Sequence, residues 1–292
     1  MSAAASPSEW SASRAAQASG ALAPIRQVGG TEVTFAARGT ETVALERGER
    51  GGFRVRIPMS EHGTEAVLMN TGGGLVGGDH AVQRITARRG ARALVTTPAA
   101  ERVYRSLGPP ARSDVALSIE ADARLAWLPQ ETLLYDGARL ERRLEADVDP
   151  TASLLVAELA VLGRRASGET IGSGSFHDRW RLRRGGRLVY AEAARLDGAM
   201  SATMARPAIG GGARIVGTAV LVAPDAEDRL EALRAVIDRW RSAGGPHHAA
   251  ASAWNGMMVV RMLGGALAPL RDLVARMAPL LIARPMPRTW WT

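Results

Sequence analysis

Between about residues 33 and 222 the chain follows the hydrophobic pattern of many short strands. Large apolar residues alternate with polar ones over 53–57, 115–119 and 125–127, as expected of strands with one buried face. Other segments are continuous apolar runs of the length of a fully buried strand, at 66–69, 94–97, 154–157 and 215–222. Glycine, proline and aspartate separate these segments at short intervals, so the pattern predicts an all-β core.

The last quarter of the chain changes to a helical pattern. Asp225 is expected to cap a helix that runs to about Arg241, because large apolar residues recur on one of its faces. Residues 254–263 are predicted to form a strand, and residues 267–284 a second helix whose last turns Pro279 should kink or loosen. The expected fold is mainly β, a single domain over 25–292 with a large β-rich core of many short strands at about 30–223 and an α+β part with two α-helices at 224–292.

A glycine-rich run, with five glycines between Gly72 and Gly78, allows two interpretations. The spacing of Gly72, Gly74 and Gly77 fits G-x-G-x-x-G, which would make the protein a nucleotide-dependent oxidoreductase. That function requires a helix after the glycines and an acidic end to the next strand. Residues 79–90 hold few large apolar side chains, and the next predicted strand runs into Pro98. The run can equally form a tight turn or bulge, where glycine permits positive φ and close backbone approach.

Composition narrows the function further. The formal net charge is +8, but every basic residue is an arginine and the arginines are scattered, whereas nucleic-acid binding needs a concentrated basic stripe. Without lysine there is no phosphate-binding P-loop. Without cysteine there are no thiolate metal sites or cysteine nucleophiles, which fits a reducing cytoplasm. No apolar run approaches the ~20 residues that cross a membrane. The Ala/Ser-rich residues 1–24 are predicted to be a disordered tail rather than a signal peptide.

No catalytic constellation stands out. The pattern G-x-S-x-G is absent, and no histidine has a metal-ligand spacing such as H-E-x-x-H. The pair His247-His248 follows Gly244-Gly245-Pro246 and is expected in a solvated loop, with weak nickel or zinc contact as the alternative. Polar groups recur at the ends of predicted strands without a nucleophile–base pair. This arrangement describes a surface for protein contacts better than an active site.

Several of these polar segments, in their order and spacing, resemble the family of the urease accessory protein UreD, also called UreH. Each motif is weak alone, but their order and spacing together are specific, and the resemblance covers about four fifths of the chain from Phe53 onward. Pro98 departs from the polar residue expected there, and the Ala/Ser-rich tail has no counterpart. The matching stretches are 70–79, 96–106, 127–138, 163–169 and 286–290.

The resemblance implies a non-enzymatic role in the maturation of nickel urease. A protein of this family binds urease apoprotein and recruits the accessory protein UreF, which docks the GTPase UreG. The assembly delivers Ni²⁺, which passes through an internal water-filled channel. The implied fold is a large, β-helix-like, mostly β structure with two helices, and the glycine run is structural. The resemblance implies no catalytic residue, no permanently bound cofactor, and neither nucleic acid nor membrane as a partner.

Acidic residues within the matching motifs are the candidates for the transient nickel path. Oxygen ligands bind Ni²⁺ weakly enough to release it, which suits a path rather than a storage site. The alternative for each is a salt bridge with one of the many arginines. Replacing Asp136 or Glu169 by alanine is expected to preserve folding and partner binding while lowering nickel incorporation. The candidates are Asp79, Glu101, Glu131, Asp136 and Glu169.

Overall fold

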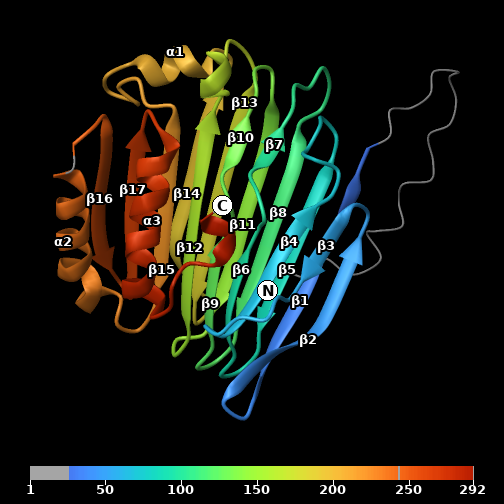
Figure 1. Ribbon diagram of the computed structural model, residues 1–292, viewed down its shortest axis with the longest axis vertical. Helices are drawn as coiled ribbons and strands as arrows, with labels where there is room; N and C mark the ends of the chain where they lie inside the picture. Colours follow the sequence, from blue (N-terminus) through green and yellow to red (C-terminus); the bar gives the residue numbers. More distant parts are fainter. Residues whose placement is uncertain (1–25, 243, 292) are drawn as a thin grey trace, which may run out of the picture.

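The computed structural model of the protein describes residues 26–242 and 244–291 (Figure 1). The predicted disordered tail at 1–24 lies outside the described residues. Within them, no helix is both long and apolar enough to cross a lipid bilayer.

Two β-sheets stacked face to face form the body of the protein (Figure 1). Sheet A has the strand order β14 (Arg187–Asp197), β13 (Ser175–Arg184), β11 (Arg139–Val148), β8 (Ala111–Ile119), β5 (His80–Ala87), β1 (Val28–Arg38) and β2 (Glu41–Arg50). Sheet B has the order β16 (His247–Trp254), β17 (Met257–Gly264), β15 (Ile215–Val222), β12 (Ser153–Leu162), β9 (Arg124–Leu128), β6 (Arg92–Thr96), β4 (Thr64–Asn70) and β3 (Phe53–Arg56). Two short strands, β7 (Glu101–Val103) and β10 (Thr132–Leu134), extend sheet B.

The chain winds between the sheets like a solenoid. From β4 to β13 it passes alternately from sheet B to sheet A, so sequential strands of the same sheet lie parallel. Alternate side chains of each strand point into the space between the sheets, where Phe35, Leu125 and Trp180 are almost fully buried. The alternating pattern of the sequence arises from this core, and the prediction of a mainly β fold is confirmed.

Helices cover the outer face of sheet B, where a second apolar cluster lies (Figure 1). α2 (Leu230–Arg241) buries Leu233, Ile237 and Trp240 there, and α3 (Leu267–Ile282) packs beside it. These two helices confirm the prediction for the C-terminal quarter. The remaining helical segments were not predicted: α1 (Met200–Ala205) and the 3₁₀ turns η2 (Arg165–Ser167), η3 (Glu227–Arg229) and η4 (Arg288–Trp290).

The predicted start of the first C-terminal helix was wrong. Asp225 caps no helix, because η3 intervenes and α2 begins only at Leu230. The carboxylate of Asp225 instead lies 2.5 Å from Nη2 of Arg229. This ion pair takes the place of the capping hydrogen bond.

The strand predicted at 254–263 is confirmed as β17 (Met257–Gly264), but its hairpin partner β16 (His247–Trp254) was not predicted. β16 and β17 pair antiparallel and turn at Asn255-Gly256, whose φ angles are 53° and 72°. Asn-Gly is the preferred dipeptide for such a two-residue turn, and it was the signal that the hydrophobic pattern alone passed over. His247 consequently begins β16 rather than lying in a solvated loop, and its buried ring packs 4.3 Å from that of Trp240.

β16 is the last strand of sheet B, so without other contacts its outer edge would present unpaired backbone N–H and C=O groups. Two arginines of α2 cover it: Nη2 of Arg241 donates to the carbonyl oxygen of Ala249 at 2.7 Å, and Nη2 of Arg234 to that of Ala251 at 3.3 Å. Exposed strand edges invite pairing with other chains, and charged side chains are a common protection.

Candidate functional site

The segments singled out in the sequence meet at one end of the two-sheet body, which we call the loop end. Here the parallel strands β4, β6, β9 and β12 of sheet B reach their carboxyl ends. Beyond them, β10 pairs in parallel with both β7 and β12, so that Thr132 lies between Glu101 and Ala160. The loop end therefore gathers segments that are far apart in the sequence.

Backbone hydrogen bonds join these loops directly. The amide of Leu75 donates to the carbonyl oxygen of Arg102 at 2.7 Å, and the amide of Tyr104 donates back to Leu75 at 2.9 Å. The amide of Ser106 donates to Gly137 at 2.9 Å. The glycine run, the segment after β6 and the segment after β10 thus form one connected unit.

The glycine run is a close-packed loop within this unit. It leads into strand β5, whereas a dinucleotide site requires a helix at that position. Gly74 and Gly78 have φ angles of 144° and 88°, which only glycine adopts readily. A Cβ atom on Gly77 would lie 1.9 Å from Oγ of Ser106. The glycines are therefore needed for close backbone approach, and the oxidoreductase alternative at Gly72–Gly77 lacks its helix.

Gly77→Ala is expected to lower the free energy of unfolding by about 1–3 kcal/mol, because the added methyl group overpacks the loop. Chemical denaturation measures the change. Gly108→Ala is the matched control in a neighbouring loop, since a Cβ atom there meets nothing within 4 Å. Equal stabilities of the two variants would contradict the proposed close packing.

Two of the candidate acids hold backbone amides. The carboxylate of Asp79 accepts from the amides of Gln27 at 2.8 Å and Val76 at 2.9 Å. Oδ1 of Asp136 accepts from the amides of Gly172 at 2.8 Å and Ser173 at 3.1 Å. Both carboxylates therefore fix the loops around them.

Two others pair with arginine, as the alternative for these positions anticipated. Oε2 of Glu131 lies 2.9 Å from Nη1 of Arg271. Oε1 of Glu169 lies 3.0 Å from Nη2 of Arg164, whose side-chain hydrogen bonds are the main cause that lowers the pKa of Glu169. The same guanidinium lies over the ring of Tyr135, at 4.4 Å from its centroid.

Glu101 differs from the other four candidates because its partner is a neutral side-chain amide rather than an arginine or two backbone amides. Nδ2 of Asn70 donates to its two carboxylate oxygens at 3.1 and 3.3 Å. Burial raises the pKa of Glu101 to about 7; the hydrogen bond from Asn70 opposes this shift and the charge of Asp79 adds to it. Among residues 26–242 and 244–291, no three His, Asp or Glu side chains converge in a way that could hold a metal ion.

Glu101→Gln is expected to stabilise the protein at pH 8 by about 1–3 kcal/mol and to change little near pH 4.5. The pKa of Glu101 is raised from 4.5 to about 7 in the folded protein, so the folded state binds this proton more tightly than the unfolded state. The stability that this proton gives is lost as the pH rises from 4.5 to about 7. Glutamine carries no charge and can still accept from Asn70. Urea denaturation at both pH values checks the prediction, which a pH-independent difference would contradict.

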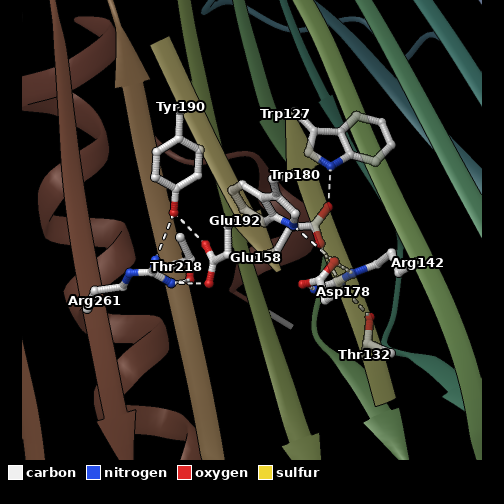
Figure 2. A network of polar contacts seen from close by, with 10 residues as sticks. All are labelled: Trp127, Thr132, Arg142, Glu158, Asp178, Trp180, Tyr190, Glu192, Thr218 and Arg261. Carbon is white, nitrogen blue, oxygen red and sulfur yellow. Dashed lines mark hydrogen bonds and ion pairs between the residues drawn. The ribbon is translucent and has the colours of Figure 1, made fainter. Parts of the chain in front are cut away.

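A buried cluster of charges between the sheets was not identified from the sequence (Figure 2). Arg142 of β11 lies at its centre, with Nη1 2.5 Å from Oε2 of Glu158 and Nη2 2.5 Å from Oδ2 of Asp178. Two indole N–H groups complete the contacts: Trp127 donates to Glu158 at 2.7 Å and Trp180 to Asp178 at 3.0 Å. Strands β9, β11, β12 and β13 each contribute to this cluster.

Within the cluster, burial favours the neutral forms of the side chains, whereas attraction between opposite charges favours the ionised forms. Burial raises the pKa of Glu158; the guanidinium of Arg142 lowers it, and the charge of Asp178 raises it again. Burial by itself lowers the pKa of Arg142, but the charges of Asp178 and Glu158 raise it overall. The arginine therefore stays charged, while Glu158 keeps a proton to a higher pH than an exposed glutamate.

A second polar group lies beside the cluster and is formed by residues of β14, β15 and β17 (Figure 2). Arg261 contacts Glu192, donates to the hydroxyl of Tyr190 at 2.9 Å and donates to Thr218 at 3.0 Å. Glu192 also accepts a hydrogen bond from Tyr190. The charge of Glu192 still acts on Arg142, so the two groups are coupled electrostatically.

The two groups together carry an excess of negative charge. Three carboxylates face two guanidinium groups, which leaves one uncompensated negative charge when all five are ionised. A buried charge of this kind favours a proton or a cation in its place. The sequence contained a signal for this cluster, because side chains two residues apart on a strand point to the same face. Glu158 lies two residues after Val156, and both side chains point between the sheets.

Comparison with known proteins identifies the family. A family model described as "UreD urease accessory protein" matches residues 27–291. Urease accessory protein UreD 3 of Methylorubrum extorquens is 48% identical over 93% of this chain and 92% of its own length. Urease accessory protein UreD 2 of Methylorubrum populi is 50% identical over 85% and 84%, and UreD of Xanthobacter autotrophicus 46% identical over 91% of each. The chain therefore belongs to the UreD family of urease accessory proteins.

Proposed function

We propose that the protein is a maturation factor for nickel urease that acts as a scaffold and catalyses no reaction itself. In this proposal it binds urease apoprotein and, together with UreF and the GTPase UreG, delivers Ni²⁺ to the urease active site. The GTP is hydrolysed by the GTPase partner. The observation that carries the proposal is the family match over residues 27–291. The proposal places the protein in the cytoplasm, in keeping with a chain that contains no cysteine.

The charge distribution suits a cation in transit. The buried cluster offers carboxylate oxygens and an excess negative charge, and both favour a divalent cation. Arginines beside these carboxylates weaken the attraction, because a guanidinium competes with the metal for the same oxygens. Such a site can take up Ni²⁺ and release it again.

One strand connects the loop end with the buried cluster. Thr132 of β10 pairs in register with Glu101 of β7, and its hydroxyl accepts from Nη1 of Arg142 at 3.3 Å. A cation that enters beside Glu101 would therefore pass from one set of carboxylates to the next along β10. Of the five candidate acids, Glu101 suits an entry point best, because its carboxylate is held neither by an arginine nor by two backbone amides.

The test is activation of urease with and without this chain. Urease subunits are co-expressed with UreF and UreG, and the nickel content of purified urease is measured by mass spectrometry together with urea hydrolysis. Urease made without this chain is expected to contain little nickel. Full nickel content and full activity in its absence would refute the proposed function.

A further inference from the structure

A long groove lies at the opposite end of sheet B from the loop end. Its volume is about 1300 Å³. It starts at the β1–β2 hairpin, which projects at the bottom of Figure 1, and passes the amino-terminal ends of β6, β9 and β12. It ends at the carboxyl end of α3 and has the 57–63 loop along one side. None of the residues discussed above as a nickel ligand lines it.

Guanidinium groups line the groove and outnumber its two carboxylates, Glu41 and Glu61. Arg47 and Arg92 make no side-chain hydrogen bond or ion pair within the part of the chain that the structure describes. Arg124 makes none there either and attracts Asp225 only over a longer distance. Because no carboxylate of the described residues lies within ion-pair distance of these three arginines, they are available to an external anion.

Arg284 adds a partly buried cation at the end of the groove. Its Nη1 donates to the carbonyl oxygen of Thr64 at 3.1 Å, but its buried Nε has no hydrogen-bond partner among the described residues. Burial lowers the pKa of Arg284, and the charge of Glu65 only partly offsets this. An anionic group bound nearby would compensate the remaining cost of this buried charge.

The walls between the arginines are partly apolar. Val43, Ile57 and Ile282 line the groove and are half-buried, whereas Leu155, Leu221 and Ala126 of sheet B line it but are almost fully buried. Met59, on the loop that forms the rim, is fully exposed. Among the described residues no Phe, Tyr or Trp lines the groove, so the ring of His62 is the one aromatic stacking platform that these lining residues offer to the bases of a nucleic acid.

We propose that this groove binds an extended, acidic and partly apolar segment of a partner protein. The carboxylates of the segment would pair with Arg47, Arg92 and Arg124, while its apolar side chains would cover the walls and contact Met59. Charge complementarity of this kind gives specificity and a fast association rate. The identification of the partner as a component of the urease assembly rests on the proposed function. The acidic and apolar character of the bound segment rests only on the groove.

A labelled synthetic peptide tests the groove directly. The probe has about twelve residues with glutamate and leucine in alternation, and its control has glutamine at every glutamate position. Fluorescence anisotropy with the full chain measures both affinities at about 50 mM and about 500 mM salt. We expect the acidic probe to bind on the order of tenfold more tightly than its neutral control at low salt, and this advantage to shrink at high salt.

Charge reversal locates the binding. The variant Arg92→Glu/Arg124→Glu is expected to weaken binding of the acidic probe on the order of tenfold. Arg179→Glu/Arg181→Glu is the matched control, because it changes the net charge equally on the exposed face of β13 and should leave binding within about twofold of the parent. Circular dichroism and thermal melting confirm that both variants are folded.

Three outcomes would overturn the proposal: no binding of the acidic probe, equal binding of the neutral peptide, or equal losses in the two double variants. Comparable binding of a single-stranded oligonucleotide, lost in the same variant, would also overturn it in favour of a general polyanion surface. The urease activation assay separates this proposal from the proposed function. A chain that binds the peptide but activates no urease refutes only the function, and the reverse result refutes only the groove.

Discussion

Arg142→Met is expected to lower the free energy of unfolding by about 3–5 kcal/mol. Methionine is an apolar side chain of similar length to arginine, so the substitution fills the space but leaves Glu158 and Asp178 buried without their cation. Removing one partner of a buried ion pair is costly, because the remaining charge must be protonated or hydrated inside the protein. The indole donors of Trp127 and Trp180 remain but cannot neutralise two carboxylates.

The neighbouring residue provides the control for this stability prediction. Arg143 lies next to Arg142 on β11 but points to solvent, so Arg143→Met should change the free energy of unfolding by less than about 0.5 kcal/mol. Equilibrium denaturation in urea at neutral pH measures both variants. A loss below about 1 kcal/mol for Arg142→Met would show that this ion pair is not needed to hold the two sheets together.

Glu158→Gln is expected to reduce nickel incorporation into urease on the order of tenfold or more, as expected if the cluster loses about 1.4 kcal/mol or more of its attraction for the cation. Glutamine can still accept the hydrogen bond from Trp127, so the fold is kept. The substitution removes the excess negative charge of the cluster, and with it the attraction for a passing cation. Nickel content per urease active site, measured after co-expression, is the readout.

A surface glutamate gives the matched control for the charge change. Glu145 lies on β11 and points to solvent, so Glu145→Gln should leave nickel incorporation unchanged. Pull-down with urease apoprotein and UreF should be equal for both variants and the parent. Normal nickel content with Glu158→Gln would remove the buried cluster from the path while leaving the scaffold role untouched.

The sequence predicted the strands well because each one has a buried face or lies wholly inside. Residues 115–119 alternate in the sequence and form part of β8, whose Val115, Leu117 and Ile119 are buried. The errors arose where a short turn decided the structure. The turn at Asn255-Gly256 was not recognised, and the segment before it holds few large apolar residues, so only the second strand of this hairpin was predicted.

The candidate site was predictable only in part. The polar segments at strand ends could be recognised, and the structure brings them together at the loop end. Most of their acids hold arginines or backbone amides there, so their part in a nickel path remains a proposal. The buried cluster depends on pairing between β11, β12 and β13, and periodicity in one segment cannot reveal which inward-facing charges of other strands will meet it.

The arginines over the β16 edge have a consequence for assembly. A guanidinium keeps its charge at every pH a cell experiences, so acidification cannot uncover the carbonyl oxygens of Ala249 and Ala251. Strand exchange or fibre growth through this side would therefore have to break both hydrogen bonds first, at low pH as well as at neutral pH.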